Sequence, residues 1–349
     1  MSTDTQGDGS PPGNVEELEE VLSRPPARLI EACRGVQGDL VLLGVGGKMG
    51  PTMARMARRA FDQAGARGRV IGVSRFRSSG LRRRLEEWGV ETIACDLLDC
   101  RQVQDLPDAP NVIAMSGFKF GASERPDLAW ATNCYMPALI CRRYHGSRIV
   151  AFSTGNVYGL VSRARGGSVE SDPPRPDGEY AMTALGRERM YEYFSQQDQI
   201  PVVLLRLNYA TELRYGVLVD LARQVARQEP IDLSMSYVNV IWLGDANAMA
   251  LQAMAHAASP ARIINLAGPE ILSIRDVCSR LGQRLGVAPR FVGSESEDAL
   301  LNNGQLGYQL LGYPLMPVDR ILDWTAQWIE QGGPLLDKPT HFQNRSGKF

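Results

Sequence analysis

DLVLLGVGGKMG, residues 39–50, is the stretch that decides the fold class of this chain. Its first five residues are almost all apolar, which is typical of a strand that a parallel sheet buries on both faces. Gly44, Gly47 and Gly50 follow directly and lead into a segment with helical periodicity. A buried strand, a glycine-rich turn and a helix in that order predict the opening βα unit of an α/β domain.

The three glycines also predict a ligand. Glycine permits a tight turn, a close approach of the backbone to a pyrophosphate, and close packing of the helix on the strand. Free amides and a partial positive charge at the helix N-terminus then favour phosphate groups. A purely structural turn is the alternative interpretation. We expect the loop, including Lys48 and Met49, to bind a nicotinamide dinucleotide.

Strands and helices alternate beyond this unit, which predicts a Rossmann-type, doubly wound parallel sheet. Strands are expected at residues 39–43, 70–74, 92–95, 111–115, 148–153 and 201–207, and helices at 50–64, 80–88, 128–143 and 180–196. The alternation loosens after Asn208. There we expect strands at 238–242 and 262–266 and helices at 273–285 and 318–331.

This pattern divides the chain into three parts. Residues 1–37 are expected to form a tail and two short helices (15–22 and 27–33), with the polar, Gly- and Pro-rich residues 1–14 disordered. Residues 38–207 form the dinucleotide-binding domain, to which 236–267 contribute late elements. Residues 208–349 form mainly a smaller, C-terminal substrate-binding domain.

Composition excludes several classes of partner. Apolar residues make up 44% of the 349, and the net charge of −1 favours neither nucleic acid nor an acidic membrane. No apolar run approaches the ~18 uncharged residues of a membrane span, and no apolar signal segment is visible. Six cysteines without a Cys-x-x-Cys pair and three scattered histidines predict no metal site and fit a cytoplasmic protein. The only lysines are Lys48, Lys119, Lys338 and Lys348.

The end of the second strand bears on the choice of cofactor. An acidic residue there would accept a hydrogen bond from the adenosine 2′-hydroxyl of NAD, but the chain has Ser74 and Arg75, with Arg77 nearby. This favours NADP, with NAD as the alternative, although a solvated basic loop would have the same sequence. Asp96 and Leu97, after the third strand, are expected at the adenine edge.

These features resemble the extended short-chain dehydrogenase/reductases, the NAD-dependent epimerase/dehydratase family, over about residues 39–331. The most specific match, Phe152–Gly159, is similar to the family's Ser-Ser-x-x-Val-Tyr-Gly run. It places Thr154 at the catalytic Ser/Thr position, and Tyr180 falls where the catalytic tyrosine opens a helix. Other similar segments are the glycine loop, Cys95–Asp99, Met115–Lys119, Val240–Asp245 and Asn265–Pro269.

The resemblance implies a role for each matching residue. Thr154 and Tyr180 are the expected catalytic residues. Beyond the glycine loop, the expected cofactor contacts are Ser74, Arg75, Asp96, Leu97, Ser116, Gly117, Lys119, Asn133 and Ser153. The expected pocket wall comprises Lys119, Asn156, Asn208, Tyr209 and Trp242, with a core position as the alternative for Tyr209 and Trp242 and a turn for Asn208.

The chain departs from the family pattern at its catalytic helix. Family members place a lysine four residues after the tyrosine, and this chain has Ala184 there. Tyrosine alone loses its proton only near pH ~10. A nearby ammonium stabilises the phenolate and so lets it form at a lower pH. Arg187, seven residues after Tyr180 and on the same helical face, is one possible substitute, and Lys119 is another.

Two further departures concern the substrate. The C-terminal Arg-x-Gly-Asp stretch that holds a nucleotide-sugar diphosphate in family enzymes corresponds here to Ser294–Asp298, whose three carboxylates are expected to repel a diphosphate. This favours a sugar, sugar acid or similar polyol over a UDP- or dTDP-sugar. Gly155 and Asn156 replace the acidic pair of the 4,6-dehydratases, which disfavours that reaction.

Two functional hypotheses follow. The first is an NAD(P)-dependent oxidoreductase or epimerase acting by hydride transfer on a sugar-like substrate. The second is a non-catalytic NAD(P)-binding sensor or interaction protein, for which Ala184 is the best support. The resemblance also implies a homodimer through helices 128–143 and 180–196. The second of these helices carries the apolar residues Leu185, Met190, Tyr191 and Phe194.

Overall fold

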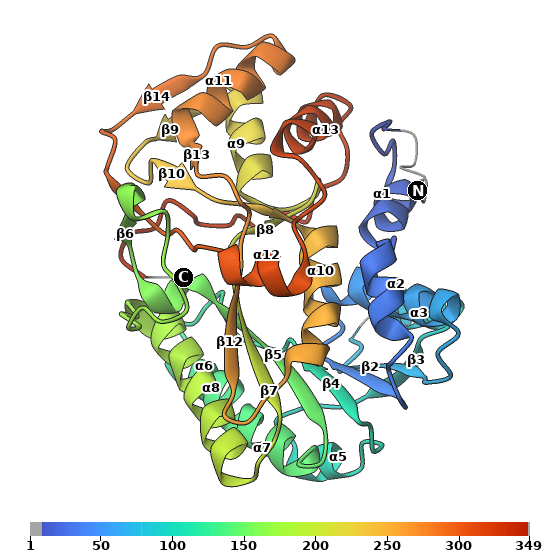
Figure 1. The fold of residues 1–349 in the computed structure, drawn as a ribbon. Helices are drawn as coiled ribbons and strands as arrows, with labels where there is room; N and C mark the ends of the chain where they lie inside the picture. Colours follow the sequence, from blue (N-terminus) through green and yellow to red (C-terminus); the bar gives the residue numbers. More distant parts are fainter. Residues whose placement is uncertain (1–8, 78, 348–349) are drawn as a thin grey trace.

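A computed structural model describes residues 9–77 and 79–347, and its centre is a seven-stranded sheet (Figure 1). The strand order is β3-β2-β1-β4-β5-β7-β12, and every pairing between neighbours is parallel. The strands are β1 (Leu40–Leu43), β2 (Val70–Ser74), β3 (Glu91–Ala94), β4 (Asn111–Ala114), β5 (Arg148–Thr154), β7 (Val202–Leu207) and β12 (Arg262–Leu266). This confirms the doubly wound Rossmann-type sheet.

Strand β1 lies between β2 and β4, where the strand order reverses direction. All four of its side chains are fully buried, as its continuous apolar sequence predicts for a central strand covered on both faces. In sheets of this kind ligands bind outside the carboxyl ends of the strands at such a reversal. The glycine loop after β1 and the segment after β4 therefore meet at the expected binding edge.

Helices cover both faces of the sheet. One face packs against α2 (Ala27–Cys33), α3 (Gly50–Ala64) and α10 (Leu243–Gln252). The other packs against α5 (Cys100–Gln104), α7 (Met136–Arg143) and α8 (Gly178–Gln197). Figure 1 shows α8 and α7 on one flank of the sheet and α2 and α3 on the other. Helix α4 (Ser79–Glu87) precedes the edge strand β3.

The helix predicted over residues 128–143 is interrupted. It consists of α6 (Pro126–Trp130), a π-helical turn (Ala131–Tyr135) and α7. Pro137, in the first turn of α7, has no N–H to donate to the carbonyl four residues earlier, and that residue is Asn133. The π turn therefore places Asn133 where the α-helical ladder is broken, with its side chain fully buried.

Part of the chain after β7 builds a smaller unit above the sheet in Figure 1. Its apolar core is formed by α9 (Val217–Ala226), α11 (Ile274–Leu285) and α13 (Val318–Glu330), together with Leu18 and Leu22 of α1 (Val15–Leu22). Short strand pairs complete it: β8 (Ala210–Thr211) with β11 (Ile241–Trp242), β9 (Pro230–Asp232) with β14 (Arg290–Val292), β10 (Tyr237–Val238) with β13 (Leu272–Ser273), and β6 (Val161–Ser162) with β15 (Asp298–Ala299). Helix α12 (Gln305–Leu311) packs beside β12.

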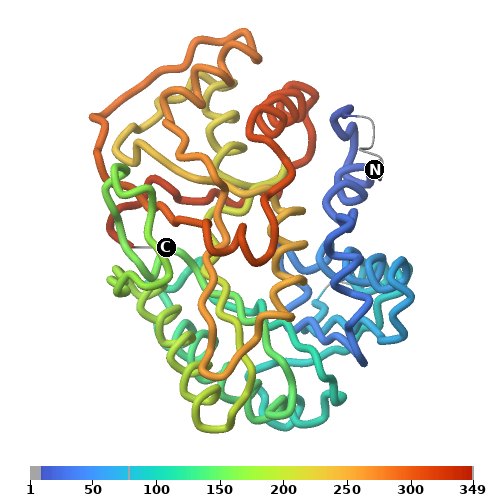
Figure 2. The backbone as a smooth tube through the Cα atoms, in the orientation of Figure 1, coloured from blue at the N-terminus to red at the C-terminus, as the bar shows by residue number. Residues whose placement is uncertain are grey.

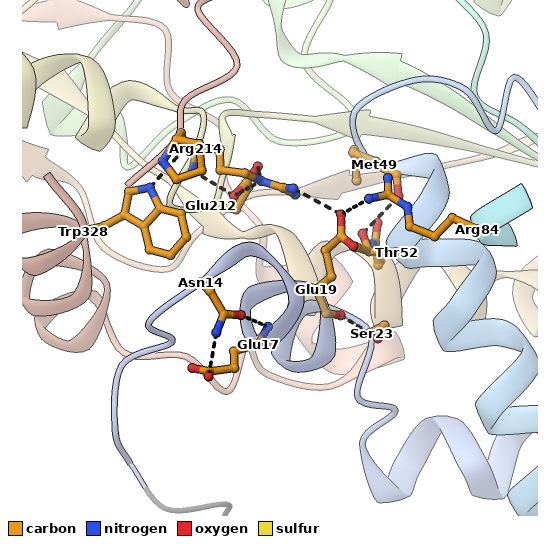
Figure 3. A network of polar contacts seen from close by, with 12 residues as sticks. Asn14, Glu17, Glu19, Ser23, Met49, Thr52, Arg84, Glu212, Arg214 and Trp328 are labelled. Carbon is orange, nitrogen blue, oxygen red and sulfur yellow. Dashed lines mark hydrogen bonds and ion pairs between the residues drawn. The ribbon is translucent and has the colours of Figure 1, made fainter. Parts of the chain in front are cut away.

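Helix α1 links this unit to the sheet domain. Figure 3 shows Glu19 between Arg84 of α4 and Arg214, which follows β8. Glu19 is 3.2 Å from a guanidinium nitrogen of each, and its side chain is almost fully buried. Arg214 also pairs with Glu212 at 3.0 Å. Of the tail expected over residues 1–14, residues 1–8 lie outside the described part, while Asn14 caps α1 by accepting from Glu17 N–H.

The segment after α13 returns across the molecule. Figure 2 shows it running from α13 back toward β6, and we call residues 335–347 the C-terminal strap. Phe342 inserts into the core of the smaller unit with 1% exposure. Arg345 donates to the carboxylate of Asp298 in β15 at 2.6 Å. These contacts attach the strap to the smaller unit.

Most predicted strands and helices end within one or two residues of their observed limits. The strand expected at 238–242 is instead two two-residue strands, β10 and β11. Within residues 9–77 and 79–347, no helix is both long enough and apolar enough to cross a membrane. The same residues contain no cluster of three His, Cys, Asp or Glu side chains that would hold a metal ion.

Candidate active site

A cavity of about 300 Å³ opens between the carboxyl end of the sheet and the smaller unit. It is lined by residues that the sequence places far apart, from the glycine loop to the C-terminal strap. The lining includes thirteen of the residues predicted to form the site: Gly44, Gly47, Lys48, Met49, Gly50, Gly117, Lys119, Ser153, Thr154, Asn156, Tyr180, Asn208 and Tyr209.

The fold itself requires two of the three loop glycines. Gly44 has a φ of +92°, and a Cβ on it would lie 2.2 Å from the hydroxyl oxygen of Ser116. A Cβ on Gly50 would lie 2.2 Å from the carbonyl oxygen of Val45. Both positions therefore exclude a side chain whether or not a ligand binds.

Gly47 differs from its two neighbours. A Cβ there would meet only the carbonyl oxygen of Gly44, at 3.5 Å, which is an ordinary contact. Its φ lies outside the left-handed range that favours glycine, and it lines the cavity. No steric demand of the described structure thus requires glycine at this position. The exposed backbone at Gly47 fits close approach by a pyrophosphate.

Thr154 and Tyr180 both line this cavity. Thr154 ends β5, and its hydroxyl oxygen accepts hydrogen bonds from the backbone and side-chain N–H groups of Asn156 at 3.2 and 2.9 Å. Those bonds leave the hydroxyl proton for another acceptor. Tyr180 lies in the first turn of α8 and is half-buried. The ammonium nitrogen of Lys119 lies 5.5 Å from the centroid of its ring.

Ala184, at the family's lysine position, is fully buried. Its methyl group packs with Val157, Tyr158 and Leu185 in a small apolar cluster. Ala184 therefore contributes no charge to the cavity. The nearest charged residue further along the same helical face is Arg187.

Arg187 lines the cavity and is nine-tenths buried. One guanidinium nitrogen donates to the Phe152 carbonyl oxygen at 2.9 Å, and another donates to the Asn133 amide oxygen. Its Nε–H has no acceptor among the described residues. A Cβ on Gly117 would lie 2.4 Å from a guanidinium nitrogen, so only glycine leaves room for this arginine. The guanidinium of Arg187 thus places a fixed positive charge in the wall of the cavity.

Asn133 holds the neighbouring loop to α8. Its amide oxygen accepts from Phe118 N–H at 2.9 Å, and its amide nitrogen donates to the Phe118 carbonyl oxygen at 3.0 Å and to the Thr183 hydroxyl at 2.9 Å. Asn133 does not line the cavity. It fixes the segment that carries Gly117 and Lys119, and it anchors Arg187.

A buried ion pair lies behind β5. Glu188 of α8 and Arg206 of β7 are 2.7 Å apart, with side chains 0% and 2% exposed. The Ser153 hydroxyl donates to the Glu188 carboxylate at 2.5 Å. The guanidinium of Arg206 stacks 4.6 Å from the centroid of the Tyr158 ring. This network fixes α8 to the carboxyl ends of β5 and β7, and therefore holds Tyr180 and Thr154 in register.

The residues expected at the adenine end lie outside the cavity lining. Ser74 ends β2, and a Cβ on Gly46 would lie 2.5 Å from its hydroxyl oxygen. Arg75, directly after it, is exposed. Asp96 accepts from Leu98 N–H at 3.1 Å, and Leu97 is buried in the sheet core. Ser116 packs against Gly44 at the opening of the site.

Two residues expected in the substrate pocket, Trp242 and Asn208, differ in whether they line the cavity. Trp242 is buried in the core of the smaller unit, with its ring 6.1 Å from that of Trp324, and it does not line the cavity. Asn208 does line it, but its amide donates to Asn239 at 2.7 Å, so this amide is already committed to the fold. Tyr209 lines the cavity with a positive φ of 37°.

The expected repulsion of a diphosphate by Ser294–Asp298 is not supported by the structure. Each carboxylate of this stretch pairs with an arginine remote in sequence, and none lines the cavity. The pairs are Glu295 with Arg275, Glu297 with Arg163 and Asp298 with Arg345. The stretch therefore gives no argument against a nucleotide sugar.

Three lining residues carried no motif that would have identified them. Phe120 follows the predicted loop, Tyr215 belongs to the smaller unit and Thr340 to the strap. Thr340 is held there by donating its backbone N–H and its hydroxyl to Asp220 at 2.8 and 2.7 Å. Only the folded chain brings these residues together.

Comparison with known proteins is consistent with this geometry. A model of the NAD dependent epimerase/dehydratase family matches residues 40–267. A UDP-glucuronic acid 4-epimerase from Bacillus cereus, solved with UDP-glucuronic acid and NAD, aligns with a TM-score of 0.69 at 19% identity, over 84% of this chain and 99% of the other. A Thermus thermophilus UDP-glucose 4-epimerase in complex with NAD aligns at 0.67 and 19%, over the same shares. No curated protein sequence matches significantly.

Proposed function

This chain belongs to the NAD-dependent epimerase/dehydratase family, and on that premise we propose that it is an oxidoreductase or epimerase. Its reaction is hydride transfer between a nicotinamide dinucleotide and a sugar, a sugar acid or a similar polyol or ketone. The observation that carries the cofactor assignment is Gly47, whose missing side chain leaves backbone open at the mouth of the cavity without any steric need of the fold.

The residues around the cavity have the chemistry for this reaction. A bound nicotinamide would supply the hydride acceptor or donor. The Thr154 hydroxyl donates a hydrogen bond to the substrate oxygen, while Tyr180 takes the proton from that oxygen during oxidation and returns it during reduction. Phe152 and Leu207 add apolar surface to the lining, which limits water around the reacting atoms.

We assign to Arg187 the charge that the family obtains from lysine. It lies two helical turns after Tyr180 on α8, and helical side chains lean toward the N-terminus, so its guanidinium extends toward the tyrosine. A fixed cation on that side stabilises a phenolate oxygen.

For the cofactor we propose NADP, with NAD as the alternative. The lack of a carboxylate at Ser74 and Arg75 supports a 2′-phosphate. The two solved relatives named above contain NAD, which supports the alternative. The ratio of the Kd for NADPH to that for NADH decides between them. If Arg75 binds a 2′-phosphate, Arg75→Ser weakens NADPH binding and leaves NADH binding unchanged.

The substrate we propose is a sugar or sugar acid, either free or linked to a nucleotide. The nucleotide-linked form is included because the carboxylates of Ser294–Asp298 are paired away from the cavity. A change in nicotinamide absorbance with a panel of sugars, sugar acids, their keto forms and their UDP derivatives tests the assignment. No absorbance change and no epimerised product with any of them would contradict it.

A non-catalytic dinucleotide-binding protein is the second candidate, and Ala184 favours it. The observation against it is that Thr154 and Tyr180 line one cavity together with Arg187. A protein that only binds a dinucleotide has no use for a proton-transfer pair at the far end of its cofactor site. Retained NADH binding without turnover of any substrate would select this candidate.

We also propose a homodimer formed through α6, the π turn and α8. Tyr191 and Phe194, which we expected at this surface, are buried against the sheet. Large side chains on the same elements are exposed nonetheless, which is unusual for a solvent-facing helix pair. They are Trp130, Tyr135, Met182 and Tyr193. Light scattering at micromolar concentration tests the dimer, and a monomer would contradict it.

A further inference from the structure

The C-terminal strap is attached to the smaller unit at several successive residues. Thr340 donates hydrogen bonds of 2.8 and 2.7 Å to the carboxylate of Asp220 in α9. Phe342 is buried in the apolar core of the unit, and Arg345 donates to the carboxylate of Asp298 at 2.6 Å. Because two of these contacts are hydrogen bonds to carboxylates and the third is a buried ring, the strap is held firmly on this side.

The strap also meets the sheet domain, at positions close to the cavity. The ring of His341 packs against that of Phe120, a lining residue, with the centroids 6.2 Å apart. Near the end of the strap, a Cβ on Gly347 would lie 2.2 Å from the carbonyl oxygen of Asp177, the residue that precedes α8. Tyr180 follows Asp177 by three positions. The strap therefore runs from the edge of Phe120 to the start of the helix that carries Tyr180.

The two sets of contacts differ in strength. Those with the smaller unit are charge-assisted hydrogen bonds and a buried aromatic side chain, which cost free energy to break. Those with Phe120 and Asp177 are a pair of tilted rings and two backbone segments in close approach, which are van der Waals contacts. A strap that opens thus separates first from the sheet domain and stays on the smaller unit.

One layer of strap lies between the cavity and the solvent at this point. Thr340 lines the cavity and is buried, whereas the next residue, His341, is exposed. The strap also lies beyond residue 267, where the match to the family model ends. Long segments of this kind, attached on one side of an active-site cavity, are the usual material of lids.

We propose that the C-terminal strap is the outer wall and the lid of the substrate pocket. It remains on the smaller unit and lifts from Phe120 and Asp177 to admit and release the substrate. This inference rests on the proposed function, because it takes the cavity beside Tyr180 as the active site. The closed strap excludes water from the reacting atoms and places Thr340 against the substrate, so that it limits which group fits beside Tyr180.

The chain's four lysines allow a test that needs neither cofactor nor turnover. Lys119 lines the cavity, with its ammonium nitrogen 5.5 Å from the centroid of the Tyr180 ring, whereas Lys338 is exposed on the strap. Burial lowers the pKa of Lys119 to about 8, so a large share of it is neutral and reactive at pH 8. A biotin N-hydroxysuccinimide ester is therefore the probe. The acylation rate of Lys119 relative to that of Lys338, followed by peptide mass spectrometry, reports how often the lid is open.

Two glycines with nearly the same backbone conformation provide the variant and its control. Gly347 has a φ of +67° and Gly332 a φ of +68°, but a Cβ on Gly332 would meet nothing within 4 Å. Gly347→Ala and Gly332→Ala thus carry similar backbone strain, and only the first pushes the strap away from Asp177. We expect the Lys119 acylation ratio to rise about tenfold in Gly347→Ala and to stay unchanged in Gly332→Ala.

A second variant and the melting temperature separate lid opening from general unfolding. Arg345→Met removes the anchor two residues before Gly347 and does not touch the cavity lining, so it should raise the Lys119 ratio as well. The Tm of each variant is measured in parallel with the Tm of Gly332→Ala. Once the absorbance panel has identified a substrate, Gly347→Ala should raise its KM and leave NADH affinity unchanged.

Three results would overturn the inference. One is a Lys119 ratio in Gly347→Ala and Arg345→Met that equals the ratio in the control. Another is acylation of Lys119 as fast as that of Lys338 in the unaltered protein, which would mean that the strap does not close the cavity. The third is an unchanged KM in a Gly347→Ala protein whose Lys119 ratio has risen. Failure of the proposed function appears separately, as no NADH binding by the unaltered protein, and leaves the acylation result decisive for the lid.

Discussion

A guanidinium nitrogen of Arg187 donates a hydrogen bond of 2.9 Å to the carbonyl oxygen of Phe152, two residues before Thr154, for which we propose a catalytic role. This bond joins α8 to the end of β5 at the level of the cavity. The positive charge that we propose as the substitute for the family lysine is thus attached to the same strand that presents Thr154. The charge and the hydroxyl therefore keep a fixed relation.

Replacing Arg187 tests its role in proton transfer. For Arg187→Met we expect kcat to fall about a hundredfold, because no cation on α8 then stabilises the negative charge that moves onto or off Tyr180 during proton transfer. Arg187→Lys retains part of the rate. Because Arg187→Met also leaves the Phe152 oxygen without its donor, thermal unfolding is measured in parallel. A loss of rate in Arg187→Lys as large as in Arg187→Met, with Tm lowered in both, would indicate a structural role only.

Removing the Tyr180 hydroxyl tests the catalytic assignment. Tyr180→Phe is expected to lower kcat about a hundredfold or more, since it removes the only group proposed to move the substrate proton. NADH affinity should change little. Tyr313→Phe is the matched control, because the Tyr313 side chain is 62% exposed and does not line the cavity. Undiminished turnover in Tyr180→Phe would remove the tyrosine from the mechanism.

Binding of an acidic ligand should depend on pH. Lysine is cationic below its pKa, and the pKa values of Lys48 and Lys119 are lowered to about 7 and about 8. Lys338, Asp220 and Glu212 also act on Lys48. Glucuronate affinity is thus highest below pH 7 and falls as pH rises through 8, measured by calorimetry on the NADH-loaded protein. Constant affinity from pH 6 to pH 9 would contradict a role for Lys48 and Lys119 in binding this ligand.

The bridge formed by Glu19 should contribute to stability. Glu19→Gln weakens its contacts with Arg84 and Arg214, at a cost of about 1–3 kcal/mol in the free energy of unfolding, since the carboxylate is almost fully buried. Glu31→Gln is the control, because Glu31 pairs with Arg34 on the exposed surface and should cost less than ~1 kcal/mol. Urea unfolding measures both. Equal urea midpoints for Glu19→Gln and Glu31→Gln would contradict a stabilising role for the contacts of Glu19.

The sequence predicted the sheet well, because its strands are continuous apolar runs and its first turn needs glycine at Gly44 and Gly50 for steric reasons. It did not predict the π turn at Asn133, since the effect of Pro137 on the helical ladder depends on the local helix geometry. The sequence also did not distinguish core positions from surface positions among the apolar residues of α8. Tyr191, expected at the surface, lies in the core.

Long-range pairing explains what the sequence missed at the site. The sequence shows the charge of Glu295 but not its ion pair with Arg275, which follows β13 and is remote along the chain. Tyr215 and Thr340 enter the cavity only because the smaller unit and the strap fold over it. Their positions depend on tertiary contacts such as the bonds from Thr340 to Asp220.

The central claim is that a nicotinamide dinucleotide binds against the open backbone of Gly47, and calorimetry with NADH and NADPH on Gly47→Val tests it most directly. The unaltered protein should bind one cofactor per chain. Gly47→Val should lose that binding, and an unchanged Tm, measured in parallel, excludes unfolding as the cause; the Cβ itself meets only the Gly44 oxygen. Gly146→Val, with open space around its Cβ, is the control and should bind normally. No heat with the unaltered protein, or full affinity in Gly47→Val, would contradict the account.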